Sequence, residues 1–219
     1  SRLDQFLPAA DAVPHKLHTS IAALLLLAGM TVAGLKVEEA VQKEASENAY
    51  IQAVASDPDV SDAVRIAMVM ASFYESSNRH IGKPYVDKLG KGQPLTVCNG
   101  LTGAEVVPGK WYSPAECYRL EKRRYIGYEI EAGRVLKHWA TYNPFQQATF
   151  LDFLHNKGAG NLAASTMLRK ANAGDLVGAC KENPRWNKGT VNGVATVLPG
   201  LQLRGGANGE ICREWRVPQ

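Results

Sequence analysis

The chain has 219 residues, of which 45% are hydrophobic and 21% are charged, so it can bury a substantial core and is expected to form one globular domain with an additional segment. This balance excludes an intrinsically disordered chain. The formal net charge of +4 at pH 7 favours an anionic partner such as nucleic acid, a lipid surface or an acidic cell-wall polymer, although solvated surface side chains account for such a charge equally well.

The first 36 residues contain an apolar stretch. No Asp, Glu, Lys or Arg occurs between Lys16 and Lys36. The length of this uncharged stretch is borderline for a membrane span, which needs about 20 apolar residues. Basic residues precede the stretch and Glu38 and Glu39 follow it, which would place the N-terminus in the cytoplasm and the remainder outside. We therefore predict a weakly hydrophobic N-terminal helix in residues 1–36. A buried core helix of a soluble protein is the alternative, and no clear cleavage box indicates a removable signal peptide.

The next segment, residues 37–58, is rich in alanine and charged side chains and predicts a connector helix. The sequence DPD at residues 57–59 ends it. Residues 59–219 are predicted to form the folded domain.

The folded domain begins with a predicted helix that has Ser61 as its N-cap and Asp62 in its first turn. Apolar residues form stripes along this helix, and Glu75 lies on a mostly apolar face near its C-terminal end. Burial and the negative end of the helix dipole both disfavour a charged carboxylate, so we predict a raised pKa for Glu75 and a proton available near neutral pH. A surface glutamate at a frayed helix end is the alternative.

After Glu75 the sequence has no helical period. Residues 83–103 consist of short alternations and glycines, a pattern that predicts a small antiparallel sheet with tight turns. Asp87 on an early strand and Thr96 on the next strand would then present a carboxylate and a hydroxyl opposite Glu75. Asp87 as an ordinary turn residue is the alternative.

The second half of the chain predicts a helical lobe. Ser113 as N-cap, Pro114 at N1 and Glu116 at N3 match a capping box. Two further helix starts are predicted at Asn143 and Asn161, each of which can serve as an N-cap.

Histidines and tryptophans in this lobe are interpreted as structural. No Cys or Ser motif accompanies His138 or His155, so both are predicted to be hydrogen-bonding residues rather than catalytic ones. Trp186 and Trp215 are predicted to pack in the core or cleft, and Trp186 is also a candidate for the substrate-binding lobe.

Four cysteines occur in the chain, at positions too scattered for a CxxC or CxxH pair, so no metal site is predicted. The sequence has no nucleotide-binding loop, and no organic cofactor is predicted either. Their even number and the export-like start favour two disulfides formed in an oxidising compartment, and four buried free thiols are the alternative. The candidates are Cys98, Cys117, Cys180 and Cys212.

Three ordered stretches resemble the phage-type lysozymes, the endolysin family. The first combines Glu75 with YVD at residues 85–87 and TVCNGLTG at residues 96–103. The second is FLHNKGAGNLAASTMLRKANAGDLVGAC at residues 153–180, and the third is GLQLRGGANGEIC at residues 200–212. The resemblance implies an α+β, mainly α, lysozyme-like fold with two lobes, in which a small antiparallel β-sheet faces a helical lobe.

The resemblance also implies a muramidase, which hydrolyses the bond between N-acetylmuramic acid and N-acetylglucosamine in bacterial peptidoglycan. Glu75 would be the acid, Asp87 the second carboxylate, and Thr96 would hold the attacking water. One departure from the family pattern affects Asp87 most: eleven residues separate Glu75 from Asp87 and eight separate Asp87 from Thr96, and both intervals are longer than usual. The alternatives are an inactive peptidoglycan-binding protein, a membrane-tethered structural protein, and a lytic transglycosylase, which would release anhydromuramic ends.

Further expectations follow from the same resemblance. One disulfide would join Cys98 to Cys117 and the other Cys180 to Cys212, one of three possible pairings. Like the export-type endolysins, the chain would be a signal-anchor protein, held by residues 1–36 at the periplasmic face of the host inner membrane and later released into the periplasm to lyse the host. Peptidoglycan and the inner membrane are the expected partners, without nucleic acid, and a monomer is expected.

Overall fold

The computed structural model describes residues 48–88, 92–191 and 193–216. The predicted N-terminal helix in residues 1–36, and the connector as far as residue 47, lie outside the described residues. No helix within the described ranges is both long and apolar enough to cross a membrane.

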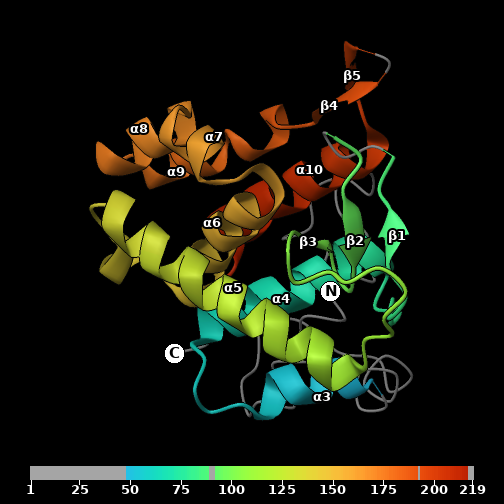
Figure 1. The fold of residues 1–219 in the computed structure, drawn as a ribbon. Coiled ribbons are helices and arrows are strands. Elements are labelled where there is room, and N and C mark those ends of the chain that lie inside the picture. The colour runs from blue at the N-terminus through green and yellow to red at the C-terminus, as the bar shows by residue number, and fades with distance from the viewer. Residues whose placement is uncertain (1–47, 89–91, 192, 217–219) are drawn as a thin grey trace, which may run out of the picture.

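The described chain is mainly helical, with one small sheet and one hairpin (Figure 1). Helix α4 crosses the middle of the molecule, α5 runs diagonally across it, and the sheet β1–β2–β3 lies to one side. In chain order the elements are α3 (Ala49–Ser56), α4 (Asp62–Ser76), β1 (Tyr85–Val86), β2 (Leu95–Val97), β3 (Leu101–Thr102), α5 (Pro114–Val135), η2 (Trp139–Thr141), α6 (Pro144–Lys157), α7 (Ala159–Ala163), α8 (Thr166–Asn172), α9 (Leu176–Cys180), η3 (Asn183–Arg185), β4 (Lys188–Val191), β5 (Val194–Val197) and α10 (Pro199–Glu214).

Local sequence signals set most of the helix starts. The Ser61 hydroxyl accepts a hydrogen bond from the Val64 N–H at the start of α4. The capping box predicted at Ser113 is present, and Asn143 forms a second one with Gln146. The predicted cap at Asn161 is wrong, because that residue lies inside α7.

Helix α4 is more deeply buried than its predicted stripes implied. Every residue from Ala63 to Ser72 is buried except Arg65, because α3, α5 and α6 all pack against this helix. A helix that is apolar on most of its circumference belongs in the centre of a fold, and α4 is the central helix of the main core.

Two hydrophobic clusters correspond to two lobes, as the predicted α+β architecture requires. The main cluster surrounds α4, α6 and α10, and a smaller one lies between the sheet and the start of α5. The residues of the smaller cluster are Val97, Cys98, Leu101, Val106, Tyr112 and Cys117. The antiparallel sheet is confirmed, with Thr96 opposite Tyr85 on one side and Thr102 on the other.

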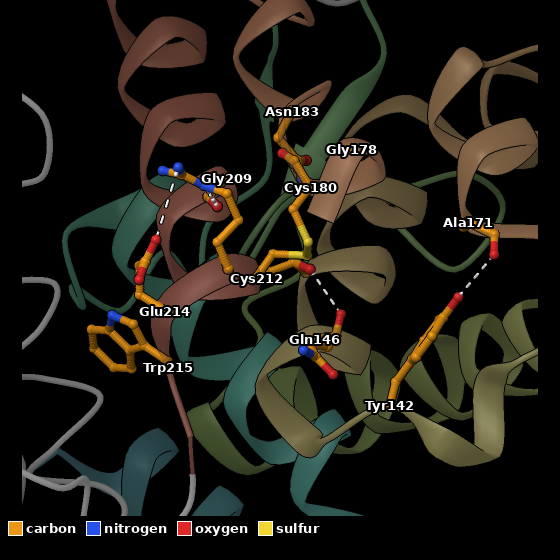
Figure 2. The surroundings of a disulfide bond; sticks show 12 residues. Tyr142, Gln146, Ala171, Gly178, Cys180, Asn183, Gly209, Cys212, Glu214 and Trp215 are labelled. Carbon is orange, nitrogen blue, oxygen red and sulfur yellow. Dashed lines mark hydrogen bonds and ion pairs between the residues drawn. A yellow bond between two sulfur atoms is a disulfide. The ribbon is translucent and has the colours of Figure 1, made fainter. Parts of the chain in front are cut away.

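Both disulfides join segments as the sequence led us to expect. Cys98 is bonded to Cys117, which ties the sheet to α5. Cys180 is bonded to Cys212, which ties α9 to α10; Figure 2 shows this bond. In the same region the hydroxyl of Tyr142, which lies between η2 and α6, donates to the Ala171 carbonyl of α8, as Figure 2 also shows.

Candidate active site

Glu75 lies in the last turn of α4, close to the small sheet. The helix ends directly after it, because Ser77 adopts a left-handed conformation (φ 53°). The Glu75 side chain is 28% exposed, so most of it is covered by its neighbours.

A buried arginine from the other end of the chain pairs with this carboxyl group. Arg204 of α10 places Nη1 2.5 Å from Glu75 Oε1. The same guanidinium group donates two more hydrogen bonds to Asp152 of α6, at 2.9 and 2.8 Å. Asn208 donates to Asp152 at 2.6 Å and accepts from the Tyr74 hydroxyl at 3.0 Å, so the buried charges are hydrogen-bonded on several sides.

A histidine completes the surroundings of Glu75. His155 Nε2 of α6 lies 3.7 Å from Glu75 Oε1, and the His155 side chain is only 7% exposed. Its ring is stacked on Tyr125, with centroids 5.3 Å apart, and meets Tyr128 edge to face. These aromatic contacts fix the orientation of the imidazole toward Glu75.

The raised pKa predicted for Glu75 is wrong in this conformation. Burial does act to raise its pKa, as expected, but the close approach of His155 and the charge and hydrogen bond of Arg204 outweigh burial and lower the pKa to about 2. The carboxyl group of Glu75 is therefore ionised at neutral pH when it is paired in this way.

The turn after β2 forms the wall beside Glu75. Gly100 has φ +82°, and a Cβ placed on it would lie 3.5 Å from Glu75 Cδ and 3.2 Å from His155 Nε2. Glycine is therefore suited to this position on two grounds, the left-handed backbone and the close approach of the two side chains.

The other two predicted site residues lie on the same sheet. Asp87 directly follows β1, and its N–H donates to the Pro94 carbonyl at 3.0 Å. Thr96 on β2 is 2% exposed, and its hydroxyl donates to the same carbonyl at 3.2 Å. Burial raises the pKa of the Tyr85 hydroxyl, and the charges of Asp87 and Glu75 raise it further.

A cavity of about 220 Å³ lies between α3, the end of α4 and the start of α5, and Glu75 does not line it. A small cavity of about 20 Å³ is lined by Arg204, Trp186 and Lys157. Trp186 also packs edge to face on Phe153, which agrees with its predicted packing role, while Trp215 packs on Phe145 in the core.

Comparison with known proteins now identifies the family. The model of the phage lysozyme family matches residues 80–208. The chain belongs to the phage lysozyme family. The matched range contains Asp87, Thr96, His155 and Arg204, whereas Glu75 lies just before it.

Similar proteins are endolysins. The SAR-endolysin of bacteriophage PS119 is 39% identical over 104 residues, which cover 48% of this chain and 59% of that protein. The SAR-endolysin of Enterobacteria phage P21 is 36% identical over 103 residues, which cover 47% of this chain and 59% of that protein. The matched part of the chain thus spans about three-fifths of the length of these relatives.

Solved structures support the lysozyme-like fold. An endolysin from Escherichia coli O157:H7 phage FAHEc1 superposes with a TM-score of 0.60 and 17% identity, over 73% of this chain and 95% of that one. The active form of the P1 phage endolysin Lyz gives a TM-score of 0.59 and 17% identity, over 74% of this chain and 90% of that one. At this identity the likeness concerns the fold alone.

Sequence reasoning missed three residues of the Glu75 environment. Arg204 lies in the GLQLR stretch that carries part of the family resemblance, so its type and place were visible without its role. His155 was interpreted as structural, and no sequence pattern marks Asp152 as a site residue. Their contacts with Glu75 and Arg204 join residues far apart in the sequence, which no local pattern reveals.

Proposed function

We propose that this chain is a phage endolysin, a lysozyme-type glycoside hydrolase that cleaves bacterial peptidoglycan between N-acetylmuramic acid and N-acetylglucosamine. The observation that carries the proposal is the position of Glu75: a partly exposed side chain at the junction of two lobes, paired with Arg204, close to His155 and beside Gly100. Membership of the phage lysozyme family supports the same reaction class.

In the proposed reaction Glu75 is the acid. A general acid must carry a proton, and the contact with Arg204 keeps Glu75 ionised, so the substrate must separate the carboxyl group from the guanidinium group before the proton is transferred. Arg204 retains both hydrogen bonds to Asp152 when this happens, so the separation leaves no buried charge unpaired. We therefore infer that the described conformation is the resting state.

Asp87 and Thr96 take the other two roles in this proposal. The carboxylate of Asp87 activates the attacking water or stabilises the positive charge that develops on the sugar, and the Thr96 hydroxyl orients that water. The backbone N–H of Asp87 and the hydroxyl of Thr96 both donate to the Pro94 carbonyl, so a shift of the loop before β2 would move the two residues together.

We also propose the place of action. Residues 1–36 would tether the chain to the inner membrane with the folded domain in the periplasm, and release from the membrane would give the enzyme access to peptidoglycan. The likeness to SAR-endolysins supports this proposal.

The test of the reaction is product analysis. Purified peptidoglycan is digested with the wild-type chain and with Glu75→Gln, and the released muropeptides are identified by mass spectrometry. We expect reducing muramic ends from the wild type and a loss of about 10³-fold in rate for the variant, because glutamine can still accept a hydrogen bond from Arg204 but cannot supply a proton.

Glu214→Gln is the matched control, since Glu214 is an exposed glutamate on α10. It should retain full activity. Anhydromuramic ends would instead identify a lytic transglycosylase, and no release by any of the proteins would leave a binding or structural role.

A further inference from the structure

A second buried carboxyl group lies near the site, and the proposed reaction does not use it. Glu121 of α5 is 2% exposed, and three donors surround it. We propose that Glu121 and Tyr50 are positioning residues that hold the Asn99–Gly100 wall against Glu75, which makes α3 part of the catalytic apparatus. This inference rests on the role proposed above for Glu75.

The hydrogen bonds of Glu121 are directed at the turn after β2. Oε1 accepts from the backbone N–H of Asn99 at 2.8 Å, and Oε2 accepts from the Asn99 side-chain amide at 3.2 Å. Oε2 also accepts from the hydroxyl of Tyr50, which is 6% exposed. A buried carboxylate with this number of donors is expected to hold their positions, because each donor left without it would be costly to bury.

From Asn99 the network reaches the end of α4. Asn99 Oδ1 lies 3.0 Å from the hydroxyl of Ser76, the residue that follows Glu75. The next residue in the turn is Gly100, whose backbone faces the Glu75 carboxyl group. A displacement of Asn99 would therefore be transmitted to Glu75 from two sides, through Ser76 and through Gly100.

The disulfide acts on the same turn. Cys98 has φ +57°, and it is bonded to Cys117, which lies one helical turn before Glu121 on α5. Helix α5 thus holds Cys98 covalently and Asn99 by hydrogen bonds. A non-glycine residue keeps a left-handed conformation only where the surrounding structure holds it. For Cys98, the disulfide and the hydrogen bonds of Asn99 to Glu121 provide that support.

Helix α3 supplies the third donor to Glu121, the hydroxyl of Tyr50. Its N-cap, Asn48, is the first described residue, so α3 follows directly on residues 1–47. Besides the bond to Glu121, the Tyr50 ring contacts the Tyr118 ring of α5 edge to face at 6.2 Å. Undocking of α3 would withdraw one of the three donors to Glu121 and loosen its hold on Asn99.

Two tyrosine hydroxyls at this interface allow a matched experiment on the full chain. Tyr50→Phe removes the hydroxyl that binds Glu121, whereas Tyr118→Phe removes one that binds Asp57 and has no link to Asn99. Both variants keep their rings and lose one hydroxyl–carboxylate hydrogen bond. We expect Tyr50→Phe to lower kcat on soluble peptidoglycan fragments about 10-fold with little change in KM, because a small displacement of a reacting group is costly, and Tyr118→Phe to keep wild-type kcat.

A second readout does not depend on activity. Hydrogen exchange of the Asn99 amide should become faster in Tyr50→Phe and stay unchanged in Tyr118→Phe. Equal kcat values and equal exchange rates in the two variants would overturn the inference. If the wild-type chain itself releases no muropeptides, the proposed function fails, and the exchange rates still decide whether Tyr50 and Glu121 hold the turn.

Discussion

Two opposing effects act on the carboxyl group of Glu75. Its burial favours the protonated form, while His155 and Arg204 favour the ionised form and bring the pKa to about 2. The position of a glutamate on a helix reveals the first effect, whereas the second depends on residues 80 and more positions away. The proton donor of the proposed reaction is thus controlled by partners rather than by the helix that carries it.

His155 gives a way to test this control. His155→Gln keeps a polar side chain beside Glu75 but carries no charge. Because His155 lowers the pKa of Glu75, the variant should raise that pKa, keep more of the acid protonated and move the alkaline limb of the pH profile of kcat/KM to higher pH, by up to about one pH unit.

The control for this measurement is His138→Gln, since His138 is exposed beside η2. Its profile should match that of the wild type. An unmoved alkaline limb in His155→Gln, or the same movement in both variants, would contradict the assigned influence of His155 on Glu75.

At the scale of elements, the short sheet forms one wall of the site and contributes little to the main core. Its strands have two or three residues, and the turn between β2 and β3 brings Gly100 against Glu75 and His155. The precision of this wall comes from α5, through the disulfide and the Glu121 hydrogen bonds, rather than from the strands themselves.

Alanine substitutions at Gly92 and Gly100 distinguish the cost of backbone strain from the effect of contact with the site. Gly92→Ala and Gly100→Ala each place a side chain on a residue with positive φ, which should cost about 1 kcal/mol of unfolding free energy in both. A Cβ at Gly92 meets nothing within 4 Å, whereas one at Gly100 lies against His155 and Glu75. Only Gly100→Ala should also lose activity, by about 10-fold or more.

Urea unfolding and muropeptide release measure the two effects of these substitutions separately. Equal activity of the two variants would show that the turn after β2 does not constrain Glu75.

Sequence patterns predicted the elements whose determinants are local. Ser113 and Asn143 begin helices as expected, because a cap, a proline and a side chain at N3 act within one turn. The cap expected at Asn161 failed because Ser165 caps the following helix instead, by accepting from the Leu168 N–H. Serine and asparagine are both favoured at N-caps, so residue type alone does not distinguish Ser165 from Asn161.

The candidate site also combines residues that local patterns predict with residues that only tertiary structure brings together. Glu75, Asp87 and Thr96 were chosen from one region of the sequence, and the structure places them on α4 and the adjacent sheet. Arg204 lies 129 residues from Glu75, so its pairing depends on how α10 packs against α4 and α6. Such a contact follows from tertiary structure and has no signature in local periodicity.

For the whole molecule, the two disulfides and the proposed tether indicate the same compartment. Disulfides form and persist in oxidising environments, and both pairs of cysteines are bonded in the described domain. They also tie separate segments together, the sheet to the start of α5 and α9 to α10. A chain tethered with this domain in the periplasm could form both bonds before its release.

The tether is tested by adding a charge to the apolar stretch. Leu26→Lys should weaken the anchor, because a charged residue at the centre of a span costs about 3 kcal/mol, and should move protein from the membrane fraction to the soluble periplasmic fraction with earlier lysis. Gln42→Lys adds the same charge outside the stretch and should leave the distribution unchanged.

The cysteines show in which compartment the soluble Leu26→Lys protein was formed. Oxidised protein on a non-reducing gel was exported before its release, whereas reduced protein was retained in the cytoplasm. An unchanged membrane fraction and unchanged timing of lysis for Leu26→Lys would contradict anchoring by residues 1–36.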